Sequence, residues 1–390
     1  ACGVRTRYLM DDISWVENGV THQVRWQSEA SVPAPQRVLI ADDTLNADTA
    51  YRLACEGTAI LWRGDFQNAR QLLQAMVRRC DHKKSSKKHK QDQENLNPKD
   101  TFNLHRVAQA QRARILGMLL IEVSANYSIN LKRAPDISQA CTEVYGAFTK
   151  PFVASLRELQ SLVGAHEWRK KGVPIPGLDG NIHPHYGVFS PIRGEYLELI
   201  EKAPLPSKEL AFDIGTGTGV IAAILAKRGI TKVVATDQDP RAIECAKENL
   251  NRLGLQKHVN LQQTDMFPDG KAPLIVCNPP WLPAKPSSSI EFAIYDPNSQ
   301  MLKAFLDGLK AHLTPNGEGW LIMSDFAERL GLRAQDALKN MIDQAGLRVE
   351  EKIDIRPKHN KIMDEADRLH QARKAEVTSL WRLKAKQSFT

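Results

Sequence analysis

A strand-and-glycine pattern in the second half of the chain predicts its fold class: Glu209-Leu-Ala-Phe-Asp-Ile-Gly-Thr-Gly-Thr-Gly219. An apolar strand runs into a loop with glycine at every second position, and a helical pattern follows from Val220 to Arg228. Without side chains, glycines let the backbone approach a ligand closely at the carboxyl end of a strand, where doubly wound α/β folds bind cofactors. We therefore expect a cofactor loop formed by Asp213, Gly215, Thr216, Gly217 and Gly219.

The glycine spacing argues against a dinucleotide cofactor. The dinucleotide fingerprint needs glycines at relative positions one, three and six, and the sixth position here is Val220. Asp237 follows the next predicted strand, where a carboxylate can accept both ribose hydroxyls of a nucleoside or cap the following helix. Asp265 follows the third strand and can accept the exocyclic amine of adenine, with Met266 packed against the ring. The pattern predicts a nucleoside-containing cofactor.

The C-terminal half predicts an α/β fold with a doubly wound parallel sheet. Apolar strands are expected at 210–214, 232–236, 258–262, 273–277 and 319–323. Helices that start near Gly219, Pro240, Ser299 and Arg333 alternate with them, which is typical of a Rossmann-like sheet. Val349–Ile355 and Val377–Leu383 add two strands, for seven in all.

A second motif, Ile275-Val-Cys-Asn-Pro-Pro-Trp281, carries the chemistry. A planar amine resists alkylation because its lone pair is delocalised. The side-chain oxygen of Asn278 and the backbone oxygen of Pro279 can each accept one N–H and favour the tetrahedral nitrogen of a transition state. Pro280 stiffens the loop, and Trp281 offers a flat face for stacking. These four residues are the predicted catalytic group, and Asn278 is also a predicted cofactor-binding residue.

With both motifs, residues from about 187 to 383 resemble class I S-adenosylmethionine-dependent methyltransferases of the Asn-Pro-Pro-aromatic branch, and within it the HemK/PrmC-like glutamine methyltransferases that modify peptide release factors. The segment Gly187–Glu195 is similar to one that precedes the glycine loop in that family. The resemblance implies S-adenosyl-L-methionine as cofactor and Arg193, Glu195 and Trp281 as substrate-binding residues. Two departures are Trp281, where the family usually has Tyr, and an N-terminal region about twice the expected length.

The N-terminal part predicts a separate substrate-recognition domain. We expect residues 1–165 to be mostly helical α+β, with a basic disordered loop at 81–100, and residues 166–193 to connect it to a methyltransferase domain at 194–390. A hairpin at 13–27 turns at Asn18-Gly19, and one short strand covers 38–40. Helices are expected at 48–56, 67–79, 104–122, 138–148 and 155–163.

Composition narrows the possible partners. The net charge of +8 and the lysine run Lys83–Lys90 favour RNA, so an amino group of an RNA base is the favoured methyl acceptor. A protein glutamine is the alternative, and a small molecule is a further one. The six cysteines form neither a metal site nor a disulfide framework, and no apolar run approaches the roughly 20 residues that span a membrane. We expect a cytoplasmic enzyme without a metal.

Overall fold

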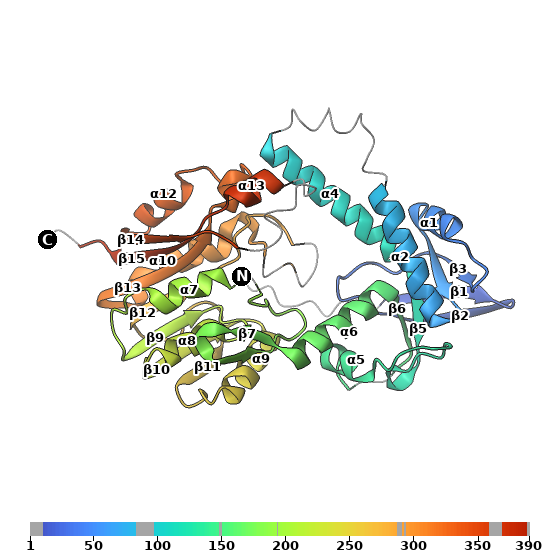
Figure 1. Cartoon of the computed structure of the whole chain (residues 1–390), viewed down its shortest axis with the longest axis horizontal. Helices are drawn as coiled ribbons and strands as arrows, with labels where there is room; N and C mark the ends of the chain where they lie inside the picture. The colour runs from blue at the N-terminus through green and yellow to red at the C-terminus, as the bar shows by residue number, and fades with distance from the viewer. Residues whose placement is uncertain are drawn as a thin grey trace. The chain divides into compact units, whose positions relative to one another are not determined.

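The computed structural model describes residues 11–82, 97–147, 150–192, 194–286, 291, 294–358 and 369–387. The chain divides into two compact units, residues 1–167 and 168–390 (Figure 1).

The first unit is organised around a six-stranded sheet in the order β1-β2-β6-β5-β4-β3. Its strands are β1 (Asp12–Glu17), β2 (Val20–Trp26), β3 (Arg37–Ala41), β4 (Thr58–Trp62), β5 (Leu119–Val123) and β6 (Phe152–Ser155). Its helices are α1 (Ala47–Cys55), α2 (Phe66–His82), α4 (Pro98–Leu116), α5 (Ser138–Tyr145) and α6 (Leu156–Lys171). Helix α1 contacts β4 and packs against α2 and α4.

The prediction of a little sheet in this unit was wrong in extent. The hairpin, with Asn18 and Gly19 at positive φ, and the strand β3 are present. Strands β4, β5 and β6 are additional, and β5 occupies the end of the segment 104–122 that was expected to be one helix. The predicted loop at 81–100 is helical at both ends, because α2 continues to His82 and α4 begins at Pro98. Its remaining residues, 83–96, lie outside the described part of the chain.

The second unit contains a seven-stranded sheet in the order β11-β10-β9-β12-β13-β15-β14. Its strands are β9 (Leu210–Ile214), β10 (Lys232–Asp237), β11 (Val259–Gln263), β12 (Ala272–Cys277), β13 (Leu313–Ser324), β14 (Leu347–Ile355) and β15 (Thr378–Ala385). The first five are parallel, and β15 is antiparallel to both β13 and β14. The predicted α/β fold and doubly wound sheet are confirmed.

Helices cover both faces of this sheet (Figure 1). They are α7 (Glu195–Lys202), α8 (Val220–Lys227), α9 (Pro240–Arg252), α10 (Gln300–His312), α11 (Phe326–Arg329), α12 (Ala337–Gln344) and α13 (His370–Ala375). Alternation along β12 explains the two cores: Leu274 and Val276 pack with α7 and α8, whereas Ile275 and Cys277 pack with α10 and α12. A strand buried on both faces reads as one continuous apolar run, which is why the sequence revealed it.

Most of the predicted connector packs with the second unit. A small hairpin, β7 (Val173–Ile175) and β8 (Gly180–Ile182), lies within it. Val173, Ile175, Leu178 and Ile182 are buried in the same core as α7 and α8. Residues 173–182 are therefore a structured part of the second unit, and not a bare link.

Candidate functional site

Strand register brings the predicted site residues to one edge of the second sheet. Ile214, the last residue of β9, pairs with Thr236 of β10 on one side and with Cys277 of β12 on the other. The next residues along the chain, Gly215, Asp237 and Asn278, therefore lie side by side at this edge, with Asp237 as the last residue of β10. The strand order reverses at β9, because β10 and β11 lie on one side of it and β12 lies on the other. The carboxyl ends of β9 and β12 therefore form the topological switch point, where such folds bind ligands.

Asp213 is fully buried and supports the glycine loop from below. Its Oδ2 atom accepts the hydroxyl of Thr216 at 2.7 Å and the backbone N–H of Ala222 at 3.1 Å. Its Oδ1 atom is buried without a hydrogen-bond partner. Burial raises the pKa of this carboxyl to about 7, despite the two donors that lower it. The residue therefore combines a structural role with one unsatisfied acceptor.

The three glycines adopt conformations that other residues rarely take. Gly215, Gly217 and Gly219 have φ of 71°, 55° and 82°. A Cβ on Gly219 would lie 3.1 Å from the Cβ of Ala246, so this glycine lets α8 approach α9 closely. A Cβ on Gly215 would meet the methyl of Met301 at 2.7 Å. Positive φ favours glycine at all three positions, and close packing against Ala246 adds to that preference at Gly219.

Asp237 closes the loop from the neighbouring strand. Its Oδ2 accepts the backbone N–H of Gly217 at 3.0 Å, and its Oδ1 accepts that of Asp239 at 3.0 Å. Burial raises the pKa of this carboxyl as well. Asp239, and not Asp237, is the N-cap residue of α9. Each carboxylate oxygen keeps a lone pair for another donor.

Asp265 and Met266 lie one strand further along the same edge. Gln263 ends β11 opposite Asp237, and Asp265 follows with an exposed side chain. Met266 has φ of 60°, and its carbonyl accepts the hydroxyl of Thr236 at 2.5 Å. The Met266 side chain packs against the core that contains Ile214 and Met301. The left-handed backbone conformation of Met266 and its hydrogen bond with the buried Thr236 fix the course of this loop.

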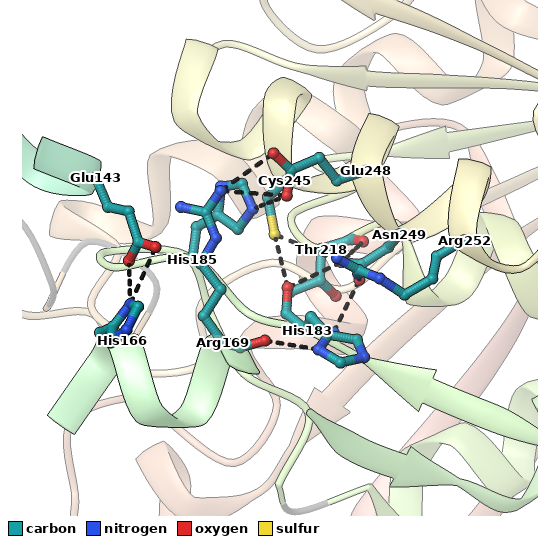
Figure 2. Close-up of polar contacts among 10 residues, drawn as sticks. All are labelled: Glu143, His166, Arg169, His183, His185, Thr218, Cys245, Glu248, Asn249 and Arg252. Atoms are coloured by element: carbon teal, nitrogen blue, oxygen red, sulfur yellow. Dashed lines mark hydrogen bonds and ion pairs between the residues drawn. The ribbon is translucent and has the colours of Figure 1, made fainter. Parts of the chain in front are cut away.

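The glycine loop has a further anchor that the sequence did not reveal. The side-chain amide of Asn249, on α9, donates to the carbonyl of Thr218 at 3.0 Å and to that of His183 at 3.2 Å, and its oxygen accepts the N–H of His183 at 2.8 Å (Figure 2). Next to it, Glu248 pairs with Arg169 and with His185 (Figure 2). Asn249 is fully buried and thus joins α9, the glycine loop and the exit of β8.

The Asn-Pro-Pro-Trp segment follows β12 at the same edge. The indole Nε1 of Trp281 donates to the side-chain oxygen of Asn278 at 3.0 Å. The ring of Trp281 meets Tyr196 of α7 edge to face, with centroids 6.5 Å apart. Asn278 is half-buried, and Trp281 packs against both cores of the sheet. The expected acceptor and the expected stacking ring are therefore one hydrogen-bonded group.

The residues of the second unit are similar in sequence to known methyltransferases. A family model described as the methyltransferase small domain matches residues 180–347. A release factor glutamine methyltransferase of Cereibacter sphaeroides is 30% identical over 196 residues, 46% of this chain and 65% of that protein. One of the same name from Mycolicibacterium smegmatis is 32% identical over 163 residues, 38% of this chain and 56% of that protein. A ribosomal protein L11 methyltransferase of Symbiobacterium thermophilum is 42% identical over 82 residues, 21% of this chain and 27% of that protein.

The second unit carries a methyltransferase domain. The predicted class I domain with a HemK/PrmC-like resemblance is confirmed, and S-adenosylmethionine is its methyl donor. The chain spans less than two thirds of the length of these relatives.

The methyltransferase domain has groups that fit this cofactor. S-adenosylmethionine carries an ammonium group and a ribose diol, which are hydrogen-bond donors. The unsatisfied Oδ1 of Asp213 would accept a donor, since buried polar atoms are rarely left unpaired. The remaining lone pairs of Asp237 would accept the ribose hydroxyls. All the predicted cofactor-binding residues lie at or near the carboxyl ends of strands β9, β10, β11 and β12.

Glu195 and Arg193 are the other two predicted substrate-binding residues. Glu195 begins α7, and its carboxylate accepts the backbone N–H of Lys358 at 2.8 Å. Arg193 lies outside the described residues. Among the described residues, no His, Cys, Asp or Glu cluster could hold a metal ion, and no helix is long and apolar enough to cross a membrane.

Proposed function

We propose that this protein transfers a methyl group from S-adenosylmethionine to the side-chain amide nitrogen of a glutamine in another protein. The main support is the similarity of the methyltransferase domain to proteins named as release factor glutamine methyltransferases. The position of Asn278 at the switch point, beside the cofactor loop, is consistent with an amide acceptor. The similarity to these proteins favours a protein glutamine over an RNA base as the methyl acceptor.

In this proposal each residue has one task. The glycine loop, Asp213 and Asp237 bind the cofactor, which supplies a methyl group on a reactive sulfonium. Asn278 and the carbonyl of Pro279 accept the two N–H groups of the glutamine amide and turn its lone pair toward that methyl. The N–CH₃ bond forms as the S–CH₃ bond breaks, and the nitrogen then loses one proton to solvent. Alignment carries most of the rate, so no strong base is needed.

We also propose that the first unit recognises the substrate. The family match begins at residue 180, so the six-stranded sheet and its helices lie outside the methyltransferase domain. A macromolecular substrate needs contacts beyond the reacting amide.

The test is transfer of radiolabelled methyl from S-adenosylmethionine into cell extract, followed by digestion with nuclease or protease. The proposal expects label that resists nuclease and appears, after proteolysis, in a peptide whose glutamine is heavier by one methyl group. Purified release factor and ribosomal protein L11 serve as defined acceptors. Label that nuclease releases as a methylated nucleoside would contradict the proposal.

An amino group of an RNA base remains the second candidate. The net charge of +8 and the five lysines between Lys83 and Lys90 favour it, although that run lies outside the described residues. The same digestion separates the two acceptors.

A further inference from the structure

The Asn278 side chain can point in two ways, and only one is useful to the reaction. A primary amide carries an oxygen acceptor on one side and an NH₂ donor on the other, and the two are similar in shape. The proposed acceptor for the substrate N–H is the oxygen. An amide turned by 180° would set its own N–H groups against those of the substrate. Something must therefore hold the orientation before substrate arrives.

Trp281 discriminates between the two orientations. An indole N–H is a donor only, so its partner at 3.0 Å must be the amide oxygen of Asn278. Turning the amide would place donor against donor. A tyrosine hydroxyl, which both donates and accepts, cannot discriminate in this way. The tryptophan therefore selects one orientation of the Asn278 amide.

The indole itself is held in place. Its ring meets the edge of Tyr196 at an interplanar angle of 89°, and Tyr196 is 3% exposed on α7. Burial raises the pKa of the Tyr196 hydroxyl, which therefore stays protonated. The buried ring of Tyr196 thus helps to fix the orientation of the indole.

We propose that Trp281 is a positioning residue that locks the Asn278 amide with its oxygen available to the acceptor nitrogen. An amide oxygen has two lone pairs, so it can hold the indole N–H and still accept one substrate N–H. The inference rests on the proposed function, because it assumes that this oxygen meets the substrate. The hydrogen bond between Trp281 and Asn278 can be tested without any substrate.

The first experiment follows the indole N–H of Trp281 by nuclear magnetic resonance in the free protein labelled with ¹⁵N-tryptophan. The chain has seven tryptophans, and the signal that Trp281→Phe removes identifies the one required. Asn278→Ala should shift that signal and speed its exchange with water by about two- to tenfold, since a net hydrogen bond is worth about 0.5–1.5 kcal/mol. An unchanged signal in Asn278→Ala overturns the lock.

The second experiment is a double-mutant cycle on methyl transfer to purified release factor. Trp281→Phe should lower kcat by about ten- to a hundredfold with KM nearly unchanged, because misplacing a reacting group by about 1 Å can cost about 100-fold. In the Asn278→Ala background the same substitution should cost less than about twofold, since the group that it positions is gone.

Two controls separate positioning from loss of fold. A benzothienyl-alanine at position 281 keeps the ring shape and removes only the N–H, and it should reproduce the loss of kcat. Trp381→Phe makes the same change on β15, where the ring faces Lys352, and should leave kcat unchanged. Equal losses from Trp281→Phe in both backgrounds overturn the inference. Full turnover in Asn278→Ala would instead overturn the proposed function.

Discussion

Asp213→Asn tests the account of the cofactor loop through the pH dependence of stability. Asp213 is 1% exposed, and burial raises its pKa from the ordinary 3.8 to about 7. Between these two values the folded protein binds a proton that the unfolded chain has released. The free energy of unfolding therefore falls as pH rises through this window. Asparagine has the same shape, keeps an acceptor for Thr216 and Ala222, and does not titrate.

The magnitude follows from the two pKa values. A folded pKa of about 7 against an unfolded 3.8 predicts that the parent loses about 3 kcal/mol of unfolding free energy relative to Asp213→Asn between pH 5 and pH 8. At pH 5 each protein buries a donor at the unpartnered Oδ1 position, O–H in the parent and NH₂ in the variant, so the difference that matters is its change between the two pH values.

The assay is urea unfolding of both proteins at each pH. The quantity compared is the difference in unfolding free energy between the two proteins at each pH. Titration of groups that both proteins share cancels in this difference. One such group is Glu158, whose pKa burial raises to about 7. A difference that stays flat from pH 5 to pH 8 would refute a buried Asp213 with a raised pKa. It would also remove the reason for regarding its free oxygen as an acceptor awaiting a cofactor.

Three further predictions concern the loop, the cofactor and the lysine run. Asp237→Ala should weaken S-adenosylmethionine binding in calorimetry by about 1.5–3 kcal/mol, the worth of a hydrogen bond to a charged group, and unchanged affinity would misplace the ribose. Gly219→Ala should lower the free energy of unfolding by more than Gly254→Ala does: both glycines have positive φ, but only at Gly219 would a Cβ meet another residue, Ala246. If lysines 83, 84, 87, 88 and 90 bind RNA, changing all five to serine should flatten the salt dependence of substrate affinity, by about 0.7–0.9 in log–log slope for each phosphate that is no longer neutralised. A glutamine acceptor predicts no such change.

The sequence predicted the second sheet well because its signals are local. Strands β9, β10 and β12 are short, mostly apolar runs. A residue type that a strand interior avoids stands at or just after the end of each: Gly215, Asp237 and Pro279. The ends were therefore placed within about a residue. Their convergence at one edge followed from the parallel order alone.

The first unit was harder to predict for a physical reason. Strand β5 follows α4 after only Gly117 and Met118, so its apolar residues extended the helical spacing of 104–116. Gly117 is the C-cap of α4 and was the signal that separates the two elements. Strands β4 and β6 are five and four residues long, too short to show a period.

Long-range contacts in the site left no trace in the sequence pattern. Asn249 reads as one polar position of a helix, yet it holds Thr218 and His183, which are 31 and 66 positions away. Tyr196 reads as a core aromatic, yet its ring abuts Trp281. Such roles depend on which helix faces which loop, and spacing along the chain does not encode that.

The most direct measurement is single-turnover methyl transfer by the parent and Asn278→Ala, with S-adenosylmethionine affinity measured on the same samples. Purified release factor is the acceptor, and mass spectrometry locates the methyl group. We expect a methylated glutamine with the parent and a rate about 100–1,000-fold lower with Asn278→Ala, because a preorganised transition-state partner is lost while cofactor affinity stays the same. An undiminished rate in Asn278→Ala, or a methyl group on any atom other than a glutamine nitrogen, would contradict this expectation.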